Sequence, residues 1–157
     1  MKHTFSVWVE NKFGVLARIA NLFAARGYNI ESLSVAETTD PTLSRMTIIV
    51  EGDEHILEQI KKQLNKMIDV VKVSDLTEKP HVERELIFMK VQFPPQKRLE
   101  ILEMINATGA KVVDLSQKNV TFQFVGTPEE ISNLVNIFKP YGIREIARTG
   151  PVAIVRG

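Results

Sequence analysis

The chain has 157 residues, of which 44% are hydrophobic and 25% are charged, and its formal net charge at pH 7 is +1. This composition is ordinary for a globular protein. The near-neutral charge lacks the basic surface that binding to nucleic acid or to an anionic membrane requires. The chain has no cysteine, which excludes disulfides, thiolate metal ligands and a cysteine nucleophile.

The apolar runs of the chain are short. The longest spans a handful of residues, far fewer than the roughly 20 that cross a bilayer. An alternating strand pattern begins as early as residue 3, so we expect neither a signal peptide nor a transmembrane segment. These features predict a soluble protein of the cytoplasm.

The first half of the chain shows the order strand, helix, strand, strand, helix, strand. Four strands are predicted, over residues 3–10, 30–38, 44–51 and 70–75, and apolar and polar residues alternate in the first of them. The first helix carries a predicted buried stripe at helical spacing, formed by Leu16, Ile19, Ala20 and Phe23. Asp53 is placed to cap the second helix.

The same order of elements recurs after a polar, proline-containing stretch at residues 77–81. Residues 127–130 read as a capping box with proline at the first helical position. Further strands are predicted over residues 85–93, 111–116, 120–126, 143–148 and 152–155. The sequence therefore predicts an α+β chain of two tandem ferredoxin-like βαββαβ domains. The expected ranges are 1–77 for the first domain, 78–84 for a linker and 85–157 for the second domain.

The loop between the first strand and the first helix has the pattern Asn11-x-x-Gly14-Val15. A glycine here lets backbone amides at the helix N-terminus point at a ligand, where the helix dipole favours a carboxylate. Asn11 and Asn29 are expected at the same end of two strands that lie side by side, so both amides would join one pocket. Taken alone, the loop is also typical of an ordinary turn in which Asn11 bonds local backbone groups.

The sequence does not indicate a catalytic or metal site. His3, His55 and His81 are scattered over different elements without metal-ligand spacing. No serine or threonine lies in a nucleophile-elbow pattern. We therefore expect no metal and no enzymatic activity in this chain.

Other protein classes share the βαββαβ topology. RNA-recognition domains stack bases on aromatic residues of their central strands, but residues 44–50 contain no aromatic residue and Trp8 is the single candidate. Acylphosphatase-like hydrolases use an anion-binding loop after the first strand, whereas Arg18 lies within the predicted helix. We therefore expect neither a nucleic-acid partner nor this hydrolase activity.

Apolar side chains are predicted on both faces of the first sheet, with Trp8, Met46 and Ile48 as the examples. Two helices cover only one face of a four-stranded sheet. Scattered exposure of single apolar residues is normal. We favour the alternative, in which a second chain covers the other face or an edge strand.

Several segments together resemble a known family. Residues 11–16 and 26–33 resemble the amino-acid-sensing ACT domain. Residues 40–47 and 81–86 are similar to the small regulatory subunits of acetolactate synthase, and the similarity continues through residues 147–150. One departure is Lys12-Phe13, where many ACT loops carry a proline before the glycine.

The resemblance implies a regulator without chemistry of its own. In that family the subunit dimerises through its ACT domains, binds valine or a related branched-chain amino acid at their interface, activates the catalytic subunit of acetolactate synthase and confers feedback inhibition. The ligand positions carried over to this chain are Asn11, Gly14, Val15, Leu16, Asn29 and Ile30. Thiamine diphosphate, Mg and FAD are expected on the catalytic subunit, and no cofactor is expected here. The alternative is a stand-alone ACT protein that controls transcription or transport of amino acids.

Overall fold

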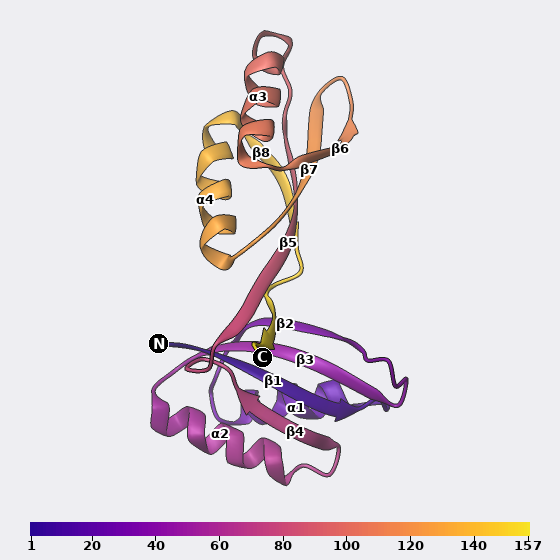
Figure 1. Cartoon of the computed structure of the whole chain (residues 1–157), viewed down its shortest axis with the longest axis vertical. Helices are drawn as coiled ribbons and strands as arrows, with labels where there is room; N and C mark the ends of the chain where they lie inside the picture. Colours follow the sequence, from indigo (N-terminus) through magenta and orange to yellow (C-terminus); the bar gives the residue numbers. More distant parts are fainter. The chain divides into compact units, whose positions relative to one another are not determined.

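A computed structural model describes all residues from 1 to 157. The chain forms two compact units, Met1–Val82 together with Pro151–Gly157, and Glu83–Gly150 (Figure 1). This division differs from the predicted ranges at the end of the chain, because residues 151–157 pack with the first unit and not with the second. Residues 81–84 of the predicted linker form the beginning of a long strand.

The first unit has the predicted order of elements. Its elements are β1 (Lys2–Glu10), α1 (Val15–Ala25), β2 (Ile30–Glu37), β3 (Leu43–Glu51), α2 (Glu54–Lys66) and β4 (Val70–Asp75). The strands pair antiparallel in the order β2-β3-β1-β4. Both helices lie on one side of this sheet (Figure 1). The predicted ferredoxin-like topology is thus confirmed for this unit.

The core of the first unit lies between the sheet and its two helices. Phe5, Val7 and Val9 of β1 are buried there, as their alternation predicts. Helix α1 buries Val15, Ile19 and Phe23, one row of residues at i, i+4 and i+8. The prediction that Leu16 and Ala20 belong to the buried stripe was wrong, because each lies one residue past this row and is exposed. The predicted cap of α2 is confirmed, since an Asp53 carboxylate oxygen accepts from the Ile56 amide at 2.9 Å.

The strand register decides which side chains face the helices. Val7 lies opposite Met46 and Phe5 opposite Ile48, so Met46 and Ile48 share the helix side with the core and are fully buried. Their predicted place on the other face was wrong. Trp8 does lie on that other face, where the Arg45 guanidinium carbon is 4.4 Å from the centre of its ring.

Part of this second face is covered by the chain itself. Strand β9 (Val152–Val155) brings Ala153 over β3: Arg45 donates to the Ala153 carbonyl at 2.9 Å, and the Ala153 amide donates to the Thr47 hydroxyl at 3.3 Å. Thr47 and Ile49 are buried there. The cover at this place is the chain's own C-terminal segment and not the second chain that the sequence pattern favours.

The second unit repeats the topology. Its elements are β5 (His81–Gln92), which starts in the first unit, η1 (Pro95–Lys97), α3 (Arg98–Thr108), β6 (Lys111–Leu115), β7 (Asn119–Gly126), α4 (Pro128–Phe138), η2 (Lys139–Tyr141) and β8 (Ile143–Arg148). The strand order is β6-β7-β5-β8. The capping box is confirmed, since the Thr127 hydroxyl accepts from the Glu130 amide and the Glu130 carboxylate accepts from the Thr127 amide.

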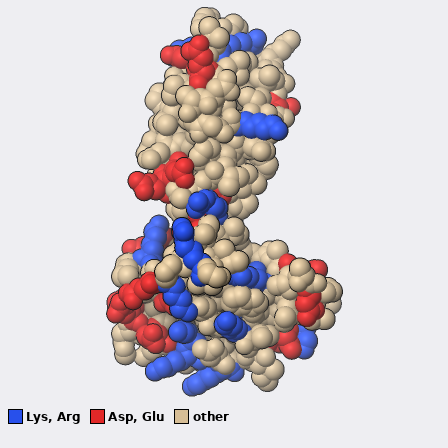
Figure 2. Space-filling model, in the orientation of Figure 1, with Lys and Arg blue, Asp and Glu red and all other residues tan.

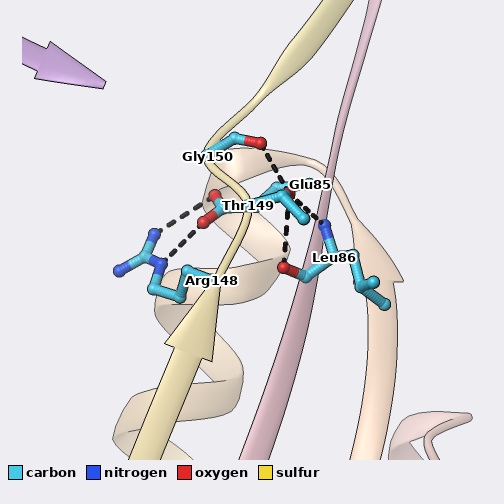
Figure 3. A network of polar contacts seen from close by, with 5 residues as sticks. All are labelled: Glu85, Leu86, Arg148, Thr149 and Gly150. Carbon is cyan, nitrogen blue, oxygen red and sulfur yellow. Dashed lines mark hydrogen bonds and ion pairs between the residues drawn. The ribbon is translucent and has the colours of Figure 1, made fainter. Parts of the chain in front are cut away.

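An ion pair between the buried Glu85 and the half-exposed Arg148 joins β5 to the end of β8 (Figure 3). Arg148 donates to both carboxylate oxygens of Glu85, at 2.6 and 3.2 Å, and Glu85 is only 2% exposed. The hydrogen bond that Arg148 donates to Glu85 raises the pKa of the guanidinium, although partial burial opposes this shift. Beside this pair, Leu86 and Thr149 exchange backbone and hydroxyl hydrogen bonds. This bidentate ion pair fixes the end of β8 against β5 in the sheet of the second unit.

We predict that Arg148→Ala destabilises the protein by about 3 kcal/mol, because a buried carboxylate then loses its partner. Replacing both residues, in Glu85→Leu with Arg148→Leu, restores most of this loss because no charge remains buried. Chemical denaturation followed by circular dichroism measures both effects. Equal destabilisation by the single and double replacements would contradict this account.

Candidate functional site

The loop after β1 is held against the β2–β3 hairpin by Asn11. The Asn11 amide donates to the Thr42 carbonyl at 2.8 Å, and its side-chain nitrogen donates to the Pro41 carbonyl at 3.0 Å and to a Glu37 carboxylate oxygen at 3.3 Å. Asn11 is exposed and fixes where the loop enters the helix. The ordinary-turn role of Asn11 is therefore present, and it also places Asn11 beside the end of β2.

Helix α1 begins at a bare N-terminus. Gly14 is its N-cap residue, with φ of 79° and ψ of −5°, a left-handed conformation that suits glycine. No side chain caps this helix end, and no acidic residue lies in its first turn. The first amides of an α-helix have no intrahelical partner. These N–H groups and the positive end of the dipole together favour a bound anion at this place.

A cation that is not among the predicted site residues lies at the same place. A guanidinium nitrogen of Arg18 lies 3.0 Å from the position that a β-carbon on residue 14 would occupy. Asp69 holds this guanidinium in place: one Asp69 carboxylate oxygen accepts from Arg18 Nε at 2.9 Å and lies 2.6 Å from a second guanidinium nitrogen. Arg18 is half-exposed, so its charge remains accessible to a ligand. Its spacing of four residues from Gly14, one helical turn, is the signal that could have identified it.

Asn29 and Ile30 do not lie with the Asn11 loop. In the sheet, β3 separates β1 from β2, so these strands are not neighbours. Ile30 pairs with Val50, which in turn pairs with His3 at the start of β1. The start of β2 is therefore at the opposite end of the sheet, about 23 Å from Glu37 at a rise of about 3.3 Å per residue. The prediction that Asn11 and Asn29 share one end of the sheet was wrong.

The six predicted ligand positions thus form two groups within a single chain. Asn11, Gly14, Val15 and Leu16 lie at one end, with Asn29 and Ile30 at the other. Val15 is buried in the core and can offer only its backbone amide, whereas Leu16 is 42% exposed. Asn29 is exposed and Ile30 half-buried.

The first unit also has a cavity of about 420 Å³ near the start of α2. It is lined by His3, Glu54, Leu57, Glu58, Lys61, Asp75, Glu78 and Lys79. None of the six predicted residues contributes to it. Burial opposes ionisation of Asp75, but hydrogen bonds from Thr77 and His3 outweigh it and lower the pKa of this carboxyl group.

The surface and the side-chain clusters give little support to other kinds of site. No group of three or more histidine, aspartate or glutamate side chains is arranged to hold a metal ion. In the lower part of Figure 2, Lys and Arg side chains gather in the middle of the visible face, with Asp and Glu side chains on both sides of them. None of the helices has the length and apolar character needed to span a membrane.

Family models match both halves of the chain. Residues 5–72 match a model described as the AHAS small subunit-like ACT domain. Residues 84–157 match a model described as the small subunit of acetolactate synthase. The chain is thus similar to this family over nearly its whole length.

Individual relatives agree with the family models. A probable acetolactate synthase small subunit of Archaeoglobus fulgidus is 52% identical over 100% of this chain and 98% of its own length. The acetolactate synthase small subunit of Aquifex aeolicus is 50% identical over 99% of this chain and 81% of its own length. The crystal structure of the small subunit from Thermotoga maritima superimposes with a TM-score of 0.91 at 39% identity, covering 100% of this chain and 98% of that one. With this fold and this similarity along its entire length, the chain belongs to the acetolactate synthase small-subunit family.

Proposed function

We propose that the chain is the regulatory subunit of a cytoplasmic acetolactate synthase in branched-chain amino-acid biosynthesis. In this proposal it activates the catalytic subunit and makes it sensitive to feedback inhibition by valine or a related amino acid. The observation that carries the proposal is the uncapped start of α1 at Gly14 with Arg18 beside it. Because the chain belongs to the acetolactate synthase small-subunit family, the proposed partner is the catalytic subunit of that enzyme. That subunit would hold the thiamine diphosphate, Mg and FAD.

The start of α1 suits the carboxylate of an amino acid. The amides of Val15 and Leu16 are in the first turn of the helix, where no side chain competes for them. Because they are fixed by the helix, they need no rearrangement to receive an anion. The Arg18 guanidinium adds a positive charge at one side, and a guanidinium is well shaped to hydrogen-bond a carboxylate.

The rest of the site requires a second copy of the chain. Strand β2 is an edge strand, so its outer backbone groups can pair with another strand. If β2 pairs antiparallel with its copy about a twofold axis between Leu33 and Ser34, residue 29 of one copy lies opposite residue 38 of the other. Asn11 already contacts Glu37 near that end of β2. The proposed dimer therefore brings Asn29 of a second copy to the Asn11 end.

This arrangement explains the separation of the two groups of predicted residues. In the dimer, Asn11, Gly14, Val15 and Leu16 of one chain would meet Asn29 and Ile30 of the other. The asparagine carbonyls supply acceptors for the ammonium group of the ligand. Leu16 and Val35, which are 42% and 44% exposed, together with Ile30 supply apolar surface for a branched side chain. A misfit of one methylene in such a pocket is worth about 1–3 kcal/mol, enough to favour valine over its larger relatives without excluding them.

A ligand between two chains can regulate because it ties their relative orientation. Regulation requires the ligand to bind two states of an assembly with different affinity. Coupling free energies of about 1–3 kcal/mol, typical of allosteric proteins, correspond to effects of about 5- to 150-fold. A site built from two chains gives this difference directly, since a change in their orientation moves one half of the site relative to the other.

We predict that Gly14→Asp abolishes the response to valine. The aspartate side chain would occupy the place of the ligand carboxylate and put a negative charge beside Arg18. The measurement is valine inhibition of the enzyme reconstituted with its catalytic subunit, together with calorimetric titration of the isolated chain. Gly109→Asp is the control, because Gly109 has a similar φ of 81° with open space around it in the other unit. Unchanged inhibition in Gly14→Asp would refute the assignment of this site.

We also predict that Val35→Asp weakens the dimer by about tenfold or more and lowers valine affinity with it, since a charge on the edge strand opposes strand pairing. Val71→Asp is the control: Val71 lies on β4 at the opposite edge of the same sheet and is 59% exposed. Sedimentation equilibrium over a range of concentrations compares the two variants with the unmodified chain. Similar dissociation constants for both variants would place the dimer contact elsewhere.

A further inference from the structure

The sheet of the first unit has a side that faces away from α1 and α2. Phe5 and Val7 of β1 point to the helices, and successive residues of a strand point to opposite sides, so Trp8 lies on the other side. Arg45 of β3 and Lys72 of β4 pair with Trp8 across the sheet and therefore share this side. We call the side chains of Trp8, Arg45 and Lys72 the basic face of the first unit.

Two cations of the basic face contact one indole ring. The Arg45 guanidinium carbon is 4.4 Å from the centre of the Trp8 ring, and the Lys72 Nζ atom is 5.2 Å from it. The π electrons of the ring attract each cation. The two cations also lie within one Debye length of each other, about 10 Å at 0.1 M salt, so they repel. An anionic group bound between them would relieve this repulsion.

The chain itself does not supply that anion. Arg45 donates to the Ala153 carbonyl, a neutral group, and burial lowers the pKa of Arg45. Lys72 is exposed, and its partner within the chain is the Trp8 ring. The carboxylates that border this side of the sheet already have cationic partners: Glu10 with Lys12 at 2.8 Å, Glu31 with Lys2 at 3.1 Å and Glu51 with the N-terminus at 3.9 Å.

Further cations lie near the basic face. Lys79 donates to the hydroxyl group of Ser74, which is on the same side of β4 as Lys72. Arg156, which follows β9, donates to the His81 carbonyl. These acceptors are neutral, so both positive charges remain. In Figure 1 the strands of the first sheet lie in front of α1, and Lys and Arg side chains gather in this part of the same view in Figure 2.

An exposed apolar edge borders these cations. Val152 and Ile154 of β9 are 53% and 54% exposed, because Ala153 between them faces the sheet and is buried. A tryptophan in contact with an arginine is typical of the residues that dominate contacts between proteins. Small ligands bind in concave sites, and the cavity near the start of α2 is lined by neither Trp8 nor Arg45. This surface therefore suits a protein partner.

The sign of the charge indicates which protein. A twofold contact uses the same surface on both copies of a chain. Two basic faces would repel each other in such a contact, so a second copy of this chain is a poor partner. The partner has to be a different protein with an acidic surface.

We propose that the basic face binds an acidic segment of the catalytic subunit, with a carboxylate of that subunit between Arg45 and Lys72. This inference rests on the proposed function, which makes the catalytic subunit the partner. The face does not include the edge strand β2, which the proposed dimer uses. Trp8 lies on β1, which leads directly into the loop at Gly14. The surface for the catalytic subunit and the candidate ligand site are thus connected by one strand.

Charge reversal at Lys72 tests the proposal in the full-length chain. The measurement is the concentration of chain that gives half-maximal activation of the catalytic subunit at low salt. Lys72→Glu should raise this concentration about tenfold or more, whereas Lys72→Arg should leave it nearly unchanged. The control is Lys62→Glu, which makes the same charge change at an exposed position of α2 and should have little effect. Added salt should weaken activation by the unmodified chain more than activation by Lys72→Gln.

Because the chain has no cysteine, one introduced cysteine reports the contact directly. Lys72→Cys is treated with a maleimide with and without saturating catalytic subunit, and mass spectrometry of the regulatory chain measures the rate of labelling. The catalytic subunit should slow this labelling about tenfold or more, because a packed contact excludes the reagent. Lys62→Cys is the control and should be labelled at the same rate in both conditions.

Three results would overturn this proposal while the proposed function stands. The first is half-maximal activation by Lys72→Glu at the same concentration as by the unmodified chain. The second is labelling of Lys72→Cys that the catalytic subunit does not slow. The third is labelling that slows as the concentration of the chain alone is raised, which would make a second copy the occupant. An unmodified chain that does not activate the catalytic subunit would refute the proposed function, and this proposal with it.

Discussion

A four-stranded sheet has two faces, and the two helices of a βαββαβ unit cover only one of them. The two halves of this chain differ mainly in whether the second face of the sheet is covered. In the first unit, β9 lies over Thr47 and Ile49 and bonds to Arg45. Much of that face is polar, and a short segment with two hydrogen bonds covers part of it. In the second unit the corresponding face keeps an apolar centre at Phe88 and Val125, which favours association with another chain.

The candidate ligand site depends on local backbone geometry and on very few side chains. Gly14 adopts a left-handed conformation that brings the chain into α1 without a capping side chain. The amides that remain unpaired at a helix start are satisfied by water or by a ligand. Arg18, held by Asp69 from the loop before β4, adds a positive charge next to Gly14. A carboxylate therefore finds both N–H donors and a cation at this place.

The order of the strands in the first sheet explains why the proposed ligand site needs two chains. Because β3 lies between β1 and β2, the start of β2 is remote from the loop after β1 in the same chain. In the proposed antiparallel pairing of two β2 strands, the start of β2 in one chain lies next to the loop after β1 in the other chain. A ligand that needs both groups of residues would then bind the dimer and not the monomer, so that ligand affinity and dimer affinity become linked.

Local features could be read directly from the order of the amino acids. Runs of apolar residues between turn-type segments located the strands, Asp53 and Thr127 marked two helix starts, and the glycine loop marked the start of α1. Each of these features depends on residues within a few positions of one another. Only the packed chain fixes the side of the sheet for Met46 and Ile48, the end of the sheet for Asn29 and the attachment of residues 151–157 to the first unit. These depend on strand order and register, which are set by packing between residues far apart in the chain. A shift of one residue in register reverses the face of every side chain in a strand, and a local pattern contains no information about that choice.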